Sequence, residues 1–148
     1  MTSFLNIVAI TSIGLMIGTE FAVWAFINPI LWQLEKHARA QAVQLFAKKL
    51  GAVMPFWYVV NLLLLVAEAI VVRHQRGALL VSSGIGIWVA VIVLTLMFLV
   101  PINNRLARPE SSLSLDEAHR EHKRWDAMHR VRVVALSSAM VLLLVAIR

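Results

Sequence analysis

The stretch FLNIVAITSIGLMIGTEFAVWAFINPI, residues 4–30, decides the fold class. It is apolar almost throughout and longer than the roughly 20 residues that a helix needs to cross the hydrocarbon layer. It also exceeds the apolar region of a secretory signal and has no basic segment before it, so we expect it to remain in the mature protein. Its only charged residue is Glu20. A carboxylate inside a membrane costs about 3 kcal/mol or more unless it is neutralised, paired or hydrated, so it usually has a function.

The composition places the whole chain in the membrane class. Hydrophobic residues make up 60% of the 148 positions, compared with about 45–50% in soluble domains. Further apolar runs at 56–72, 78–100 and 131–147 each predict a transmembrane helix. We therefore predict a single all-α domain over residues 1–148, which forms an integral membrane four-helix bundle. Its predicted partners include the lipid bilayer. The chain has no cysteine, which excludes disulfides, thiolate metal sites and cysteine nucleophiles.

The basic residues indicate how the chain crosses the membrane. The net charge is +6, and most lysines and arginines lie in the segments 31–55 and 101–130. The positive-inside rule places both segments in the cytoplasm and both termini outside, as expected for a bacterial inner-membrane protein. Because this topology explains the positive charge, we predict no nucleic-acid partner. Trp57 and Tyr58 are typical of the aromatic belt at the same interface.

Two connecting segments predict further helix. Residues 35–50 have apolar side chains near helical spacing, which predicts an amphipathic helix on the cytoplasmic surface that Gly51 and Pro55 end. The sequence Ser114-Leu-Asp-Glu117 is a capping box. Since nothing interrupts the helix between Leu115 and Ile147, we expect the fourth span to extend into the cytoplasm.

The polar residues of the spans gather toward the predicted cytoplasmic half. Glu20, Trp24 and Asn28 recur every four residues and so form one stripe on an α-helix. Packing of the bundle would bring this stripe to the end of the third span and the start of the fourth. We therefore predict one shared cavity lined by Glu20, Trp24, Asn28, Asn103, Asn104, Trp125, His129 and Arg130.

Several of these residues also have a purely structural interpretation. Glu20 is either an acid/base group or an ion-pair partner that holds helices together. Asn28 precedes Pro29 and marks the helix end on that reading, as asparagines often do. Either Arg130 or Arg132 pairs with Glu20 or with an anion, and the other extends to the headgroups.

A metal site is a further hypothesis. His122, Asp126 and His129 are spaced i, i+4, i+7, which puts them on one helix face. Two imidazoles and a carboxylate suit a divalent metal such as iron, copper or zinc. A polar helix start can also carry such residues by chance. The sequence leaves the cofactor open between none and a single transition metal.

Three motifs together carry a family resemblance. The runs Gly18–Pro29, Pro101–Asn104 and Trp125–Arg130 resemble the DUF1772 family, which includes the fungal anthrone oxygenase-like proteins. The resemblance extends over nearly the whole chain and implies a small membrane protein with four spans. It also implies an oxidoreductase of the oxygenase type, which oxidises an anthrone to an anthraquinone without a classical flavin or haem.

The resemblance implies roles that suit the residues of the predicted cavity. Glu20 or His129 would remove a proton from an acidic aromatic ketone, whose enolate reacts with dioxygen. Asn104, or else Asn103 or Arg130, would stabilise the developing oxyanion. The expected catalytic residues are thus Glu20, His129 and Asn104, and the others, including the tryptophans that would flank the rings, bind the hydrophobic substrate.

Two other classes of function remain open. The chain has no Walker loop, GxSxG elbow, HExxH motif or dinucleotide-binding glycine pattern, so phosphoryl and hydride transfer lack support. A non-enzymatic protein that carries a small hydrophobic molecule or protons would connect the cavity with Glu68 near the opposite membrane surface. A structural subunit of an oligomer would hold Glu20 in a closed ion pair with no cavity beside it.

Overall fold

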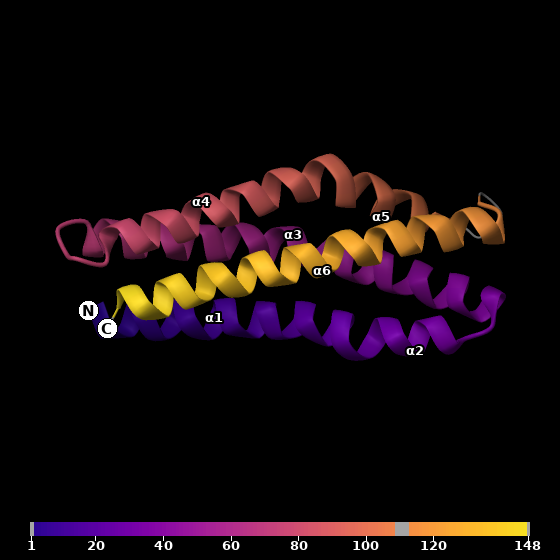
Figure 1. Cartoon of the computed structure of the whole chain (residues 1–148), viewed down its shortest axis with the longest axis horizontal. Helices are drawn as coiled ribbons and strands as arrows, with labels where there is room; N and C mark the ends of the chain where they lie inside the picture. Colours follow the sequence, from indigo (N-terminus) through magenta and orange to yellow (C-terminus); the bar gives the residue numbers. More distant parts are fainter. Residues whose placement is uncertain (1, 109–112, 148) are drawn as a thin grey trace.

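The computed structural model describes residues 2–108 and 113–147, which form an elongated helical bundle (Figure 1). Its elements are α1 (Thr2–Ala22), η1 (Val23–Ile27), α2 (Asn28–Gln33), α3 (Lys36–Val72), α4 (Ala78–Leu94), η2 (Thr95–Leu99), α5 (Val100–Leu106) and α6 (Leu115–Ala146), where η marks a π-helix. The stretches Phe4–Gln33, Lys36–Val72, Ala78–Leu106 and Leu115–Ala146 are each long and apolar enough to cross a membrane. The predicted all-α, four-span membrane bundle is confirmed.

The four long helices run alternately up and down, as short connections require. The α1 helix packs against α3 and α6, and α4 packs against α3 and most extensively against α6. Both chain termini lie at one end of the bundle, which we call the terminal end (Figure 1). The opposite end holds α2, α5 and the first turns of α3 and α6, and we call it the loop end.

The third helix differs from the prediction. The segment 35–50 is the first part of α3 rather than a separate surface helix, because α3 continues through Gly51 and Pro55 to Val72. A proline inside a helix costs about 3 kcal/mol, and apolar side chains that pack on both sides of Pro55 offset that cost. Glu35 caps α3, and the two backbone N–H groups that donate to its carboxylate hold its pKa below the usual value.

The fourth long helix begins where the sequence predicts. The Oγ of Ser114 accepts a hydrogen bond from the backbone N–H of Glu117 at 3.2 Å, and the Glu117 carboxylate accepts one from the N–H of Ser114 at 2.9 Å. These two bonds complete the capping box. From there α6 continues without a break to Ala146.

Two π-helical turns interrupt the α-helical spacing. In η1 the N–H of Asn28 donates to the carbonyl of Val23, five residues earlier, and Pro29 follows at once. The η2 turn has the same i−5 bond and precedes Pro101. A proline lacks the N–H of the normal ladder and crowds the carbonyl four residues back, and a wider turn relieves that crowding. The helices therefore continue past both prolines. Each π-turn contains one extra residue, which rotates the helix after the turn relative to the helix before it.

The core has two apolar parts with polar residues between them. The terminal cluster contains Ile13, Met16, Tyr58, Leu65, Val72, Val81, Trp88, Val91, Leu136, Ala139 and Leu143. The loop cluster contains Leu31, Val43, Ala47, Ile102 and Leu106. Along the first span, Glu20 lies between Met16 of the terminal cluster in α1 and Leu31 of the loop cluster in α2. The buried carboxylate is therefore placed where the two apolar clusters meet.

Gly77, which caps α4 at the terminal end, provides a test of this packing. A Cβ atom there would collide with the backbone oxygen of Ala146 in α6, so the backbone would have to move. We expect Gly77→Ala to lower the free energy of unfolding by about 1–3 kcal/mol, the usual cost of overpacking. Gly86→Ala is the matched control, because a Cβ at Gly86 meets nothing within 4 Å. Thermal unfolding in detergent measures both, and equal stabilities would contradict this packing.

Candidate functional site

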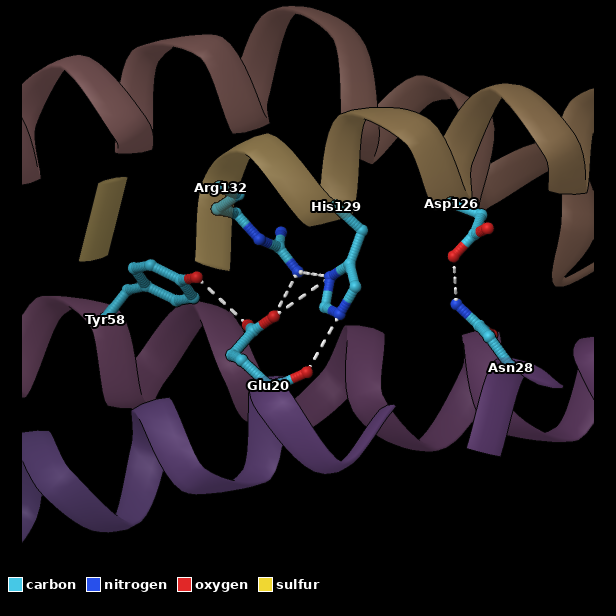
Figure 2. A network of polar contacts seen from close by, with 6 residues as sticks. All are labelled: Glu20, Asn28, Tyr58, Asp126, His129 and Arg132. Atoms are coloured by element: carbon cyan, nitrogen blue, oxygen red, sulfur yellow. Dashed lines mark hydrogen bonds and ion pairs between the residues drawn. The ribbon is translucent and has the colours of Figure 1, made fainter. Parts of the chain in front are cut away.

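Glu20 is almost fully buried, with 2% of its surface exposed, and three side chains surround its carboxylate (Figure 2). The hydroxyl of Tyr58 in α3 donates to Oε1 at 2.9 Å. From α6, Nη2 of Arg132 donates to Oε2 at 2.7 Å, and Nδ1 of His129 lies 3.1 Å from the same oxygen. The acid of the first span is thus paired with a cation and bonded to two other helices.

The contacts of His129 define which nitrogen carries its hydrogen. Nε2 lies 3.0 Å from the backbone oxygen of Glu20, and since a carbonyl only accepts, Nε2 is the donor. Nδ1 lies between Oε2 of Glu20 and Nη2 of Arg132, which is 2.9 Å away. A neutral ring accepts from Arg132 through Nδ1, and a protonated ring donates from Nδ1 to Glu20. The imidazole and the carboxylate are therefore within hydrogen-bonding distance of each other.

A cavity of about 230 Å³ lies beside this pair. Its polar wall is formed by Glu20, Tyr58, His129, Arg132, Asn103, Asn104, Thr19 and Thr95. The remaining lining is mostly apolar and comes from η1, α3, α4, η2, α5 and α6: Val23, Leu50, Gly51, Met54, Pro55, Val59, Ile92, Leu96, Leu99, Val100 and Trp125. Both π-turns thus contribute to its wall, and such turns are frequent at functional sites. A few polar groups in an apolar hollow are the usual form of a small-molecule site.

The cavity reaches the outer surface of the bundle between α3 and η2. Two of its lining residues, Val59 in α3 and Leu96 in η2, are 52% and 59% exposed. Both belong to apolar stretches that are able to cross the membrane. The opening therefore lies on an apolar part of the bundle's surface, which suits a hydrophobic ligand.

The structure brings together five of the eight residues predicted to share a cavity. Glu20, Asn103, Asn104, Trp125 and His129 all line it, although they come from three separate spans. Trp125 also stacks on the His129 ring, with centroids 4.6 Å apart and planes 11° apart. The amide of Asn103 donates to the backbone oxygen of Ala47 at 3.0 Å, which joins α5 to α3. The chemical roles of these residues stay predictions.

The other three predicted residues lie elsewhere. Trp24 lines an open groove between α1 and α6. The expected stripe Glu20–Trp24–Asn28 assumes α-helical spacing throughout, whereas the buried residues here are Glu20, Val23 and Asn28, the last two joined by the π-turn. Asn28 donates to Asp126 at 2.6 Å (Figure 2) and lines a smaller cavity of about 40 Å³. Arg130 is half-exposed and pairs with Asp126 rather than with Glu20.

The predicted metal ligands do not converge. Nε2 of His122 lies 3.4 Å from Oδ1 of Asn28, Asp126 binds Asn28 and Arg130, and His129 binds Glu20. No group of three His, Asp or Glu side chains within residues 2–108 and 113–147 is placed to hold a metal ion. His122 and His129 are seven positions apart on the helix, which is about 10 Å along its axis. Sharing a helix face is therefore not enough for one ion to bind both.

The sequence interpretation missed Tyr58 and left Arg132 unassigned. Tyr58 is 5% exposed and points into the bundle, not toward the interface as predicted for the aromatic belt. The signal was its spacing, because Tyr58, Asn61, Leu65 and Glu68 form one buried stripe of α3. For Arg132 the signal was its position three residues after His129, on the same face of α6.

Comparison with known proteins adds one finding. The family described as anthrone oxygenase matches residues 42–142, which is more than half of the chain. Among curated proteins and solved structures, no match was found. The matched region contains α4, η2, α5, most of α3 and most of α6, and so three of the four spans. The chain therefore belongs to the anthrone oxygenase family.

Proposed function

We propose that this protein is a membrane oxygenase that converts an anthrone-like aromatic ketone to the corresponding quinone with dioxygen. The observation that carries the proposal is a paired carboxylate and imidazole on the wall of an otherwise apolar cavity that opens on an apolar part of the bundle's surface. Its volume of about 230 Å³ is near the lower limit of small-molecule pockets, roughly 300–1,000 Å³. A compact polycyclic molecule suits this space better than a long lipid chain.

The proposed chemistry begins with removal of a proton from the CH₂ carbon opposite the ketone. Oε1 of Glu20 accepts one hydrogen bond, from Tyr58, and a carboxylate oxygen has two acceptor positions, so one remains for a substrate proton. His129 is placed to share that proton through Nδ1. The resulting enolate oxygen carries negative charge, which Arg132 and the amides of the polar wall stabilise.

The reaction balances without a further oxidant. The carbanion gives an electron pair to dioxygen, which forms a C–O bond and a hydroperoxide. Loss of the second C–H proton then breaks the O–O bond, leaves a C=O group, and releases the outer oxygen as water with the two protons. Both atoms of dioxygen are accounted for, and no step passes through a metal.

The rival functions fit the geometry less well. A structural subunit was expected to hold Glu20 in an ion pair without an adjacent cavity, yet the cavity borders the Glu20–Arg132 pair. A carrier was expected to connect the cavity with Glu68, which is not among its lining residues. A protein that binds a hydrophobic molecule without changing it would still use the same cavity, so turnover is the deciding property.

The test is oxygen uptake by the purified, detergent-solubilised protein with anthrone as the substrate. We expect consumption of dioxygen and formation of anthraquinone in equal amounts, faster than the reaction in detergent alone. Elemental analysis of the same sample reports whether a transition metal accompanies the activity. Saturable anthrone binding with no gain in rate would overturn the oxygenase proposal and support the binding protein instead.

The opening between α3 and η2 gives a separate prediction. Leu96→Trp fills the opening, and we expect kcat/KM for anthrone to fall about tenfold or more, because overpacking costs about 1–3 kcal/mol and 1.4 kcal/mol is a factor of ten. Leu94→Trp is the matched control, since Leu94 is 50% exposed on the same span and does not line the cavity. Initial rates over a range of anthrone concentrations measure both variants. Equal values would place the substrate's route elsewhere.

A further inference from the structure

A further hollow lies at the loop end, apart from the cavity beside Glu20, which we call the main cavity. It has a volume of about 30 Å³ and is formed by the first turns of α3 and α6 and the last residues of α5. Its charged and imidazole-bearing lining residues are Lys36, Arg39, Arg108, His119 and His122, and we call this hollow the basic cleft. Among the described residues that line it, none is acidic.

Arg39 is the first sign that the basic cleft is built for an anion. Only 9% of its surface is exposed. Its Nη2 lies 2.9 Å from Nδ1 of His119, and its guanidinium lies over the ring of Trp32, 5.0 Å from the centroid. Neither of these two contacts carries a negative charge. The nearest carboxylate along α3 is that of Glu35, which is exposed and accepts from two backbone N–H groups at the start of the helix. A buried cation is usually paired with an anion, because desolvation of an unpaired charge is costly.

His122 is an independent second sign. It is 3% exposed, lines the basic cleft, and stacks on Trp32 with centroids 4.4 Å apart. Its Nε2 faces Asn28, but its Nδ1 is buried and has no hydrogen-bond partner within the described part of the chain. Buried polar atoms in native proteins nearly always have a partner. Because Nε2 donates to Asn28, Nδ1 of the neutral ring is an acceptor, and a hydroxyl group of a ligand in the cleft would supply its partner.

We infer that the basic cleft binds a phosphate group. A guanidinium matches phosphate oxygens in a planar fork, and basic pockets between transmembrane helices bind phospholipid headgroups. The cleft holds little more than the oxygens of one such group, since a single water needs about 10–15 Å³. Arg39 and Arg108 would contact the phosphate, and the apolar residues Ala40, Val43 and Leu106 at the same site would contact what it is attached to. This inference does not depend on the oxygenase proposal.

The phosphate has two sources, an anionic lipid headgroup or free phosphate, and the experiment has one arm for each. The protein is placed in phosphatidylcholine nanodiscs with or without phosphatidylglycerol, and bound lipids are counted by native mass spectrometry. In the second arm, inorganic phosphate is titrated into the phosphatidylcholine sample while the thermal midpoint is followed, because a ligand that binds the folded state raises it. Retention of one phosphatidylglycerol assigns the headgroup, and a saturable rise with phosphate assigns the free anion.

Three variants separate a specific site from general charge attraction. We expect Arg39→Gln to weaken binding about tenfold or more, as loss of charge-assisted hydrogen bonds does, and Arg108→Gln to weaken it to a smaller extent. Arg108 is exposed, and the side chain of Gln44 binds its backbone oxygen, so we expect replacement of the Arg108 side chain to leave the fold intact. This variant therefore keeps the test valid if the variant at the buried Arg39 does not fold. The matched control is Arg124→Gln, because Arg124 is exposed like Arg108 but lies on α6 outside the cleft. Unchanged binding in Arg108→Gln, an equal loss in Arg124→Gln, or no binding in either arm would overturn the inference.

Discussion

Glu20→Gln is expected to reduce anthrone turnover by about 10²–10⁴-fold, the usual contribution of a general acid–base group, while the helical content stays the same. Glutamine has nearly the shape of glutamate and keeps one acceptor oxygen for Tyr58 or Arg132. Its amide cannot take a proton from the substrate, and its NH₂ group donates where the carboxylate accepted. Initial rates of anthraquinone formation measure the loss, and circular dichroism reports the fold.

Glu68→Gln is the matched control for that variant. Glu68 is another buried carboxylate, with 0% of its surface exposed, and it does not line the cavity beside Glu20. We expect this variant to keep its turnover. If Glu20→Gln retains activity close to wild type, the base is another group. If both variants lose activity equally, a proton path through Glu68 explains the result better than catalysis at Glu20.

Arg132→Leu is expected to lower the free energy of unfolding by about 3–5 kcal/mol, as does removal of one partner from a buried ion pair. Arg132 is 11% exposed and Glu20 is 2% exposed, so the carboxylate that remains has little access to water. The change also removes the contact between Arg132 and Nδ1 of His129. Unfolding in mixed detergent, compared with wild type, measures the effect.

Two further variants test the cause of that loss. The double variant Glu20→Gln with Arg132→Leu is expected to be more stable than Arg132→Leu alone, because it no longer buries an unpaired charge. Lys36→Gln breaks the pair with Asp116, whose side chains are 62% and 74% exposed, and surface pairs contribute about 0–1 kcal/mol. If Arg132→Leu costs no more than Lys36→Gln, the buried pair is not what stabilises the bundle.

Much of the fold follows from residue types along the chain. Four apolar runs of sufficient length predict the spans, and Ser114 with Glu117 predicts the start of α6, because both signals depend on neighbours in sequence. Glu20 stands out for the same reason, since a lone carboxylate in an apolar run is anomalous wherever its helix packs. The sequence also predicts that Glu20 and His129 share a cavity, because both lie toward the same half of their spans.

The remaining features depend on contacts between distant residues. Pro55 ends a helix by local rules, yet α3 continues through it because the side chains on both sides pack into the core. The π-turn of η1 places Val23 and Asn28, five residues apart, among the buried residues of the first span, and no helical period assumed in advance predicts that spacing. The choice of Arg132 over Arg130, and of Tyr58 as a partner of Glu20, was decided by which faces of α6 and α3 meet α1. Spans and isolated charges are local properties of the chain, whereas the pairing of side chains across helices is set only when the helices pack.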